Sequence, residues 1–439
     1  MAQRDPLLFE DGSGLEKGQP PRKLIRWIDA APRRFKIFGT CVFITLNVLL
    51  TGALIDQHFD EGHKLGGGSH MAKVSGVLDY LNSLSPEQDE ELVLMMDAYD
   101  IHLQLPKSVL TSRYYSTREA AQRRLVEYAG HNTVDDGNLQ QLVVFGAGNR
   151  CAPNWPHTVA CYAIPNSPLP EDLYGGNTDT SMGHNHWSSV RQRFLDSGYV
   201  LGPVGAMRRI FAEAWKEIQE WPETDPFDDG QRFSADVYRG SDQSVFAAMY
   251  GRQEWVREKL RLKHAPPGTK PRTSEVFGTV VDNALSPSFT HEPFDPDLSE
   301  GNPYEFGIYL DFWSELGHQT INSDWDAPLG DLRQAEAGRR TGRIQIGIPV
   351  FRHMNGPKEH REIDWPMIWY QPKARAMLKD LKEFLGEPAE KTWQEHKADS
   401  TLLIAGGAWT DKGELLKWEQ LCPSDYDKEI FRDVKEPNT

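Results

Sequence analysis

Two aspartates three residues apart follow a short apolar run. Asp97 and Asp100 come directly after Leu92–Met96, a continuous apolar stretch typical of a buried parallel strand. In open α/β sheets, ligands bind beyond the carboxyl ends of the strands. Two carboxylates on such a turn can converge on one hard divalent cation, which would also take oxygens from a diphosphate. The same spacing is common in an ordinary capped turn, so the pair alone does not establish a metal site.

A histidine and a lysine follow another strand candidate at 344–350. His353 can supply a nitrogen ligand, and Lys358 can supply a positive charge for a phosphate. Between them, the turn at Asn355 and Gly356 could bring backbone N–H groups near an anion. Taken alone, His353 fits an ordinary loop histidine better than a metal ligand.

Two further segments are polar where a fold alone would not require it. Ser197 and Gly198 follow Asp196, and Asp242 and Gln243 open a predicted helix. An acidic residue in the first turn of a helix is favourable through the helix dipole, which is a sufficient structural explanation for Asp242. That explanation does not extend to Gln243.

The elements that must position these residues alternate along the chain. Strand candidates lie at 92–96, 141–145, 306–310 and 344–350, and helical patterns begin near Lys73 and at Pro203 and cover 361–384. This alternation predicts an α/β fold in which a mostly parallel sheet is flanked by helices. The expected domain spans 73–439 and follows a Gly-rich linker at 56–72.

Composition restricts the partners and the cysteine chemistry. The formal net charge of −16 argues against nucleic acid as a partner, because phosphate binding needs a basic surface. Four cysteines are too few for a disulfide scaffold. Cys151 and Cys161 could form a disulfide in an oxidising compartment, and the sequence leaves this open.

An uncharged apolar run at residues 37–55 predicts one N-terminal transmembrane helix. At about 1.5 Å per residue, the run is long enough to cross about 30 Å of bilayer hydrocarbon. Basic residues precede it and acidic residues follow it, so 1–36 would be a cytosolic tail and the rest would be luminal. A signal peptide and a buried core helix are the alternatives.

Six motifs occur in a characteristic order. They are Asp97-Ala-Tyr-Asp100, Val144-Phe-Gly-Ala147 with Cys151, Leu195-Asp-Ser-Gly198, Ser241-Asp-Gln243, Leu310-Asp-Phe312 and His353-Met-Asn-Gly356. The series resembles the glycosyltransferase domain of the procollagen-lysine glycosyltransferases, and more closely a group of related fungal type II membrane proteins. The resemblance covers about residues 72–385. It implies a GT-A fold, a UDP-sugar donor and a Golgi or endoplasmic reticulum membrane.

The resemblance also implies roles for single residues. Asp97, Asp100 and His353 would bind Mn²⁺ (or Mg²⁺) together with the UDP diphosphate. Asp242 and Gln243 would lie where that family holds the sugar or the acceptor. A carboxylate such as Asp242 could stabilise an oxocarbenium-like sugar or orient the hydroxyl of the acceptor, a glycan or protein that the sequence does not identify.

Five further residues are expected near the donor. The resemblance implies that Ser197 and Gly198 line the donor sugar through backbone groups. Asn355, Gly356 and Lys358 would lie near the phosphates, where Lys358 and the cation would stabilise the charge that develops on UDP.

One feature departs from the pattern of the family. GT-A domains begin with a βαβ unit that binds uridine, which needs roughly 30 residues or more. The segment between Ile55 and Lys73 is shorter and Gly-rich, so we expect this first nucleotide-binding unit to be missing. The alternative function is therefore a catalytically impaired relative that acts as a membrane-tethered binding or scaffold protein. A metal-dependent hydrolase is a third hypothesis, although such sites generally need more ligands.

Overall fold

The structure is a computed structural model that describes the central part of the chain and a few short segments after it. The described residues are 69–97, 100–154, 158–170, 191–221, 240–270, 294, 296–299, 301–319, 348–355, 368, 370–385, 407–409, 415–417, 420 and 431. The expected cytosolic tail at 1–36, the expected transmembrane helix at 37–55 and most of the linker at 56–72 lie outside them.

No helix among these residues is long and apolar enough to cross a membrane. Even α4 (Lys107–Ala129) and α9 (Asp242–His264), with 23 residues each, carry charged side chains along their length. The prediction of an N-terminal transmembrane helix is therefore not supported. The expected type II topology and the Golgi or endoplasmic reticulum membrane depended on that helix, and they are corrected with it. The expected contact of 37–55 with a bilayer lies outside the described residues.

The main sheet has four strands in the order β1-β4-β3-β5. They are β1 (Leu92–Met96), β4 (Phe194–Pro203), β3 (Val143–Gly148) and β5 (Ile308–Leu310). β4 is antiparallel to both β1 and β3, and only β3 and β5 pair in parallel. The expectation of a mostly parallel sheet is therefore wrong. The sheet is mixed, and β1 and β3 point the same way on either side of β4.

β4 is a strand that the sequence pattern did not predict. All its residues are buried, yet Asp196, Ser197 and Gly198 interrupt its apolar pattern as a turn would. Its pairing with β3 is irregular here, because Phe145 pairs with Val200 whereas the next residue of β3 pairs with Asp196. Ser197 and Gly198 are thus left out of the β3 ladder and lie beside the end of β1.

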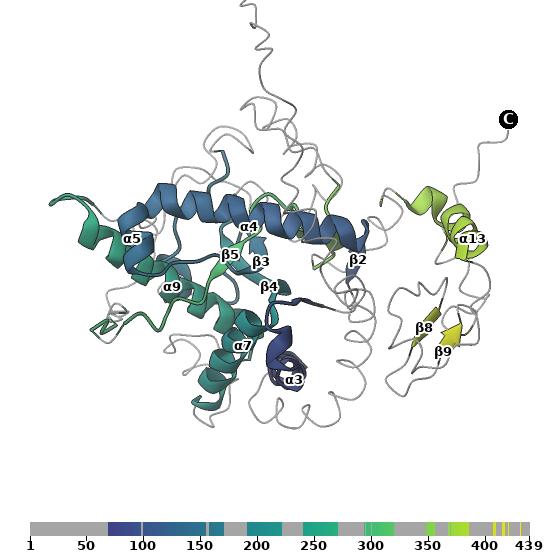
Figure 1. The fold of residues 1–439 in the computed structure, drawn as a ribbon, viewed down its shortest axis with the longest axis horizontal. Coiled ribbons are helices and arrows are strands. Elements are labelled where there is room, and N and C mark those ends of the chain that lie inside the picture. The colour runs from purple at the N-terminus through teal and green to yellow at the C-terminus, as the bar shows by residue number, and fades with distance from the viewer. Residues whose placement is uncertain are drawn as a thin grey trace, which may run out of the picture.

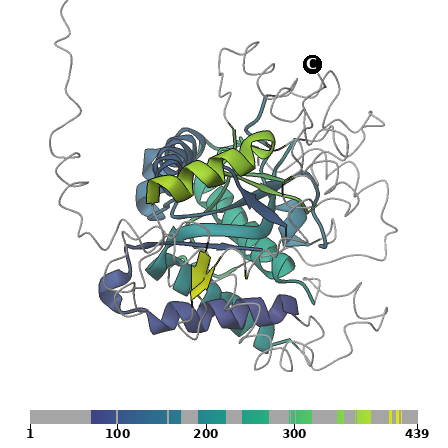
Figure 2. The same ribbon diagram turned by 90° about the vertical axis from the view of Figure 1, so that its right-hand side faces the viewer.

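Helices cover both faces of the main sheet (Figure 1). α3 (Ser69–Ser83), α7 (Val204–Gln219) and α9 share one hydrophobic core with sheet residues such as Phe145. α4 shares a second core with the adjacent Val144. Successive side chains of a strand point to opposite faces, so the two neighbours belong to different cores. Figure 2 shows α3, in purple, running beneath the strands.

A second, three-stranded sheet lies at the end of β1. It has the order β2-β7-β6, with β2 (Ile101–Leu103), β7 (Phe351–His353) and β6 (Gly317–Gln319). β7 is antiparallel to β2 and parallel to β6. The remaining elements are a 3-10 turn at Pro86–Gln88, α5 (His131–Asp136), α6 (Val159–Tyr162), a 3-10 turn at Gln371–Lys373, α13 (Ala374–Leu385), β8 (Gly407–Trp409) and β9 (Leu415–Lys417).

Several expected elements occur with shifted ends. The strand at 92–96 has the expected bounds, and the helix after Pro203 is α7. The strand expected at 344–350 lies partly outside the described residues, and regular pairing begins only at Phe351. The helical pattern at 361–384 corresponds to α13 in its second half, and 361–367 lie outside the described residues. Cys151 and Cys161, left open by the sequence, form a disulfide.

Candidate metal centre

Asp97, Asp100 and His353 come together where two strand pairings meet. Asp97 follows β1, and its N–H donates to the carbonyl oxygen of Gly198 at 2.8 Å, which extends the β1–β4 ladder by one residue. Asp100 directly precedes β2, and the register of β2 with β7 sets His353 opposite Ile101. Backbone pairing therefore brings together side chains that are far apart in the sequence.

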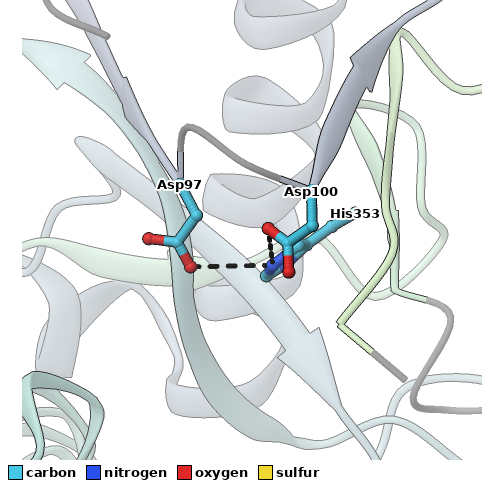
Figure 3. Close-up of side chains that lie close together, drawn as sticks. All are labelled: Asp97, Asp100 and His353. Carbon is cyan, nitrogen blue, oxygen red and sulfur yellow. Dashed lines mark ion pairs between the residues drawn. The ribbon is translucent and has the colours of Figure 1, made fainter. Parts of the chain in front are cut away.

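The three side chains point toward one another (Figure 3). One donor atom of each lies within 4.8 Å of the other two. His353 Nε2 is 3.3 Å from Asp100 Oδ1 and 3.6 Å from Asp97 Oδ2. Ligands that share one cation, with bonds of about 2.0–2.6 Å, are separated by similar distances. The expected convergence is confirmed, and the group could hold a metal ion.

His353 is enclosed by carboxylates. Burial by itself would lower the pKa of its imidazole, but the hydrogen bond with Asp100 and the charges of Asp196, Asp100 and Asp97 outweigh burial and raise that pKa. A metal ligand must be the neutral imidazole, so protonation of His353 and cation binding compete. His353 Nδ1 makes no hydrogen bond among the described residues and faces Asp196 Oδ1 at 3.7 Å.

Asp196 is a buried carboxylate behind His353 that the sequence prediction did not include. Its Oδ1 accepts hydrogen bonds from the Gly198 N–H and Gln319 Nε2, each at 3.0 Å. Its Oδ2 accepts one from Asn355 Nδ2 at 3.2 Å. Burial raises the pKa of Asp196, while the His353 charge opposes that rise. The only signal in the sequence was a carboxylate within an otherwise apolar stretch.

Gly198 is required by the close approach of the histidine ring. A Cβ atom at this position would collide with Cε1 and Nδ1 of His353 and would also approach Asp196 Oδ1 at 3.0 Å. Contacts this short are not found for real Cβ atoms, so a side chain here would displace the imidazole. Gly198 was expected beside the donor sugar, and the structure sets it directly against the candidate metal ligand.

Asp242, Gln243 and Ser197 form a second polar group next to the candidate metal ligands. Ser197 Oγ donates to Asp242 Oδ2 at 3.0 Å, and the Ser197 N–H donates to Gln243 Oε1 at 3.4 Å. Gln243 Nε2 donates to the carbonyl oxygen of Ala152, beside the disulfide. Both ends of the Gln243 amide are therefore occupied by backbone groups, and the Ser197 hydroxyl is directed at Asp242.

Lys73 joins this group to the candidate metal ligands. Its Nζ is 2.5 Å from Asp242 Oδ2 and 3.0 Å from Asp97 Oδ1. His70, one turn earlier in α3, has its Nδ1 3.5 Å from Asp242 Oδ1. Neither residue was predicted from the sequence, because nothing in an amphipathic helix pattern indicates which polar side chain faces a site formed by distant strands.

The charges of this group stabilise one another. Burial alone would raise the pKa of Asp242, but Lys73 and the hydrogen bond with His70 hold it well below its usual range. Burial alone would lower the pKa of Lys73, but Asp242 and Asp97 raise it above its usual value. Asp242 is therefore an ionised carboxylate although its side chain is only 4% exposed.

Three of the five residues expected near the donor are described. Ser197 and Gly198 lie at the site as given above. Asn355 turns its side chain inward, donating to Gln319 Oε1 at 2.7 Å as well as to Asp196. Gly356 and Lys358 lie outside the described residues.

The comparisons with known proteins do not assign this site. No family model matches the chain, and no curated protein matches it. The geometry of the candidate metal centre, together with the motifs in the sequence, is therefore the basis for any functional assignment.

Proposed function

We propose that this chain transfers a sugar from a UDP-sugar donor with the help of a divalent cation held by Asp97, Asp100 and His353. The observation that carries the proposal is the convergence of these three side chains at the end of β1. It is supported by the resemblance to the procollagen-lysine glycosyltransferases, because residues from four of the shared motifs lie around this one point. Two of these motifs supply the three candidate ligands, and the other two supply Ser197 and Asp242.

The donor set fits Mn²⁺, with Mg²⁺ as the alternative. Two carboxylates and one imidazole combine hard oxygen donors with a nitrogen donor, and three protein ligands leave coordination positions for phosphate oxygens and water. When bound, the cation would neutralise the charge that develops on the diphosphate leaving group. The protein's own part is to hold the ligands in place, through the β1–β4 ladder for Asp97 and the β2–β7 register for His353.

Asp242 is the residue best suited to act on the sugar or the acceptor. It is ionised, nearly buried and held in place by Lys73 and by the Ser197 hydroxyl. A carboxylate in this state can stabilise positive charge on the sugar ring or accept a hydrogen bond from the acceptor hydroxyl. Ser197 orients Asp242, and Gln243 fixes the backbone of Ser197.

Calorimetric titration of the full chain with UDP, with and without Mn²⁺, tests the proposal. We expect UDP to bind only with Mn²⁺. Asp100→Asn should weaken this binding at least about a hundredfold, because loss of one ligand removes several kcal/mol of charge stabilisation and about 1.4 kcal/mol is tenfold. Asp135→Asn removes an exposed carboxylate of α5 and is the matched control, which should bind UDP like the wild type.

The outcomes separate the candidate functions. Mn²⁺-dependent binding of UDP, followed by release of sugar from a UDP-sugar, would support the transferase. A chain that binds Mn²⁺ but binds no nucleotide in its presence would contradict the transferase and favour a non-catalytic binding protein. Equal binding of UDP and GDP would indicate that the cation and the phosphates dominate recognition, whereas tight binding of UDP alone would reveal a uridine pocket.

A further inference from the structure

Lys73 is the point of contact between α3 and the two carboxylate groups of the site. Its ammonium touches Asp97 Oδ1 at 3.0 Å and Asp242 Oδ2 at 2.5 Å, and its side chain is only 17% exposed. No other described residue has a charged atom within ion-pair distance of both carboxylates. One positive charge thus joins a candidate metal ligand to the candidate catalytic carboxylate.

The two oxygens of Asp97 have different neighbours. Oδ1 contacts Lys73, whereas Oδ2 lies 3.6 Å from His353 Nε2, on the side where the three donor atoms converge. A cation bound by Asp97, Asp100 and His353 would therefore share Asp97 with the ammonium of Lys73. Two cations on one carboxylate repel each other, and each reduces the negative charge that the other can use.

We propose that Lys73 is a positioning residue whose ammonium holds Asp242 beside Asp97. The ammonium is also a resident cation, that is, a fixed positive charge that competes with the divalent cation for Asp97. The proposal rests on the metal centre of the proposed function and adds a control of its affinity. Lys73 keeps the carboxylates together in the metal-free chain. It also makes cation binding weaker than the three ligands alone would give.

The sign of the effect on metal binding distinguishes this role from a merely structural one. A unit charge about 4–5 Å from a cation, at an effective dielectric constant between those of protein and water, changes its binding by on the order of 1–2 kcal/mol, which is roughly tenfold. Removing Lys73 should therefore tighten the binding of the divalent cation. Damage to the fold would weaken it instead.

Titration of the full chain with Mn²⁺ alone, followed by the electron paramagnetic resonance signal of free Mn²⁺, is the test. We expect Lys73→Met to bind Mn²⁺ about tenfold more tightly than the wild type. Lys73→Arg, which keeps the charge, should stay within about twofold to threefold of the wild type. Asp242→Asn should weaken binding, because Lys73 then has only Asp97 as its partner. Opposite changes in Lys73→Met and Asp242→Asn are the expected signature.

Two further variants serve as controls. Lys216→Met removes a lysine that is 63% exposed on α7, so it makes the same change in net charge and should leave Mn²⁺ binding unchanged. The double variant Lys73→Met/Asp242→Asn removes both charges of the pair. It leaves no buried charge without a partner there, and it should still bind Mn²⁺ more tightly than Asp242→Asn does.

Each outcome bears on the proposal. The proposal would be overturned if Lys73→Met bound Mn²⁺ no more tightly than the wild type and the double variant bound it no more tightly than Asp242→Asn. Failure of the wild type to bind Mn²⁺, with binding gained in Lys73→Met, would contradict the proposed function but support Lys73 as the resident cation. Absence of Mn²⁺ binding in every variant would contradict both.

Discussion

At the scale of single residues, the candidate metal centre depends on the absence of a side chain at Gly198. The ring of His353 lies where a Cβ atom of residue 198 would be. The imidazole is also buried, and Asp100, Asp196 and Asp97 surround it. One methyl group at this point should therefore act on the metal ligands directly.

We expect Gly198→Ala to weaken Mn²⁺ binding at least about tenfold, because the added methyl group must push His353 away from the two carboxylates. Gly205→Ala is the matched control. Gly205 lies at the start of α7, and the atoms nearest to its added Cβ would be those of Asp89, at 3.1 Å. Gly205→Ala should bind Mn²⁺ like the wild type. Equal Mn²⁺ affinity of Gly198→Ala and the wild type would mean that His353 does not ligate the cation.

At the scale of elements, α9 is tied to the segment before β5 by a fully buried arginine. Arg257 forms two hydrogen bonds with the Glu305 carboxylate, from Nε at 2.9 Å and from Nη2 at 2.5 Å. A third, from Nη1 to Glu254 Oε1, is 2.9 Å long. Its Nη2 also donates to the carbonyl oxygen of Gln140, just before β3. The side chain therefore links one helix to the segments that lead into two strands of the main sheet.

Arg257→Ala should lower the free energy of unfolding by about 3–5 kcal/mol, because it removes the cationic partner of two carboxylates whose side chains are each only 10% exposed. Arg123→Ala is the control. It removes an arginine that is 61% exposed and pairs with Glu119 within α4, and it should cost less than about 1 kcal/mol. Urea denaturation followed by circular dichroism measures both changes. A loss in Arg257→Ala as small as that in Arg123→Ala would contradict this account.

The sequence revealed the elements better than their pairing. Apolar runs located β1, β3 and β5 to within a few residues, because a buried strand needs a continuous apolar stretch. β4 was not predicted as a strand, because Asp196, Ser197 and Gly198 interrupt its apolar pattern and contact the candidate site. The parallel sheet was predicted wrongly for the same reason, since β4 is the strand that turns the sheet mixed.

The candidate site was predicted only as far as motifs could identify it. Asp97, Asp100 and His353 were found, and the β2–β7 register explains why they meet. Asp196 and Lys73 were missed, because their roles come from burial and from the packing of α3 against the sheet. Such contacts are properties of the packed molecule, and no short motif records them.

At the scale of the whole molecule, stability should depend on pH through the buried charges at the site. The pKa of Asp242 is held well below its usual range, because Lys73 and His70 outweigh the effect of burial. A carboxyl group whose pKa is lower in the folded chain stabilises the fold above its unfolded pKa, near 3.9, and loses that contribution as pH falls further. Unfolding releases the whole chain, so the effect appears in the global free energy of unfolding.

We therefore expect Asp242→Asn to be less stable than the wild type by about 2 kcal/mol at pH 5.5, because Lys73 loses one of its two partners. This difference should shrink as the pH falls from about 4 toward 2, where the unfolded chain takes up the proton that folded Asp242 resists. His70, whose pKa is raised by its hydrogen bond with Asp242, is protonated throughout this range and adds no titration of its own. Urea denaturation of both proteins at a series of pH values measures the difference. A constant difference between pH 5.5 and 2.5 would mean that Asp242 titrates normally in the folded chain and that Lys73 does not hold its charge.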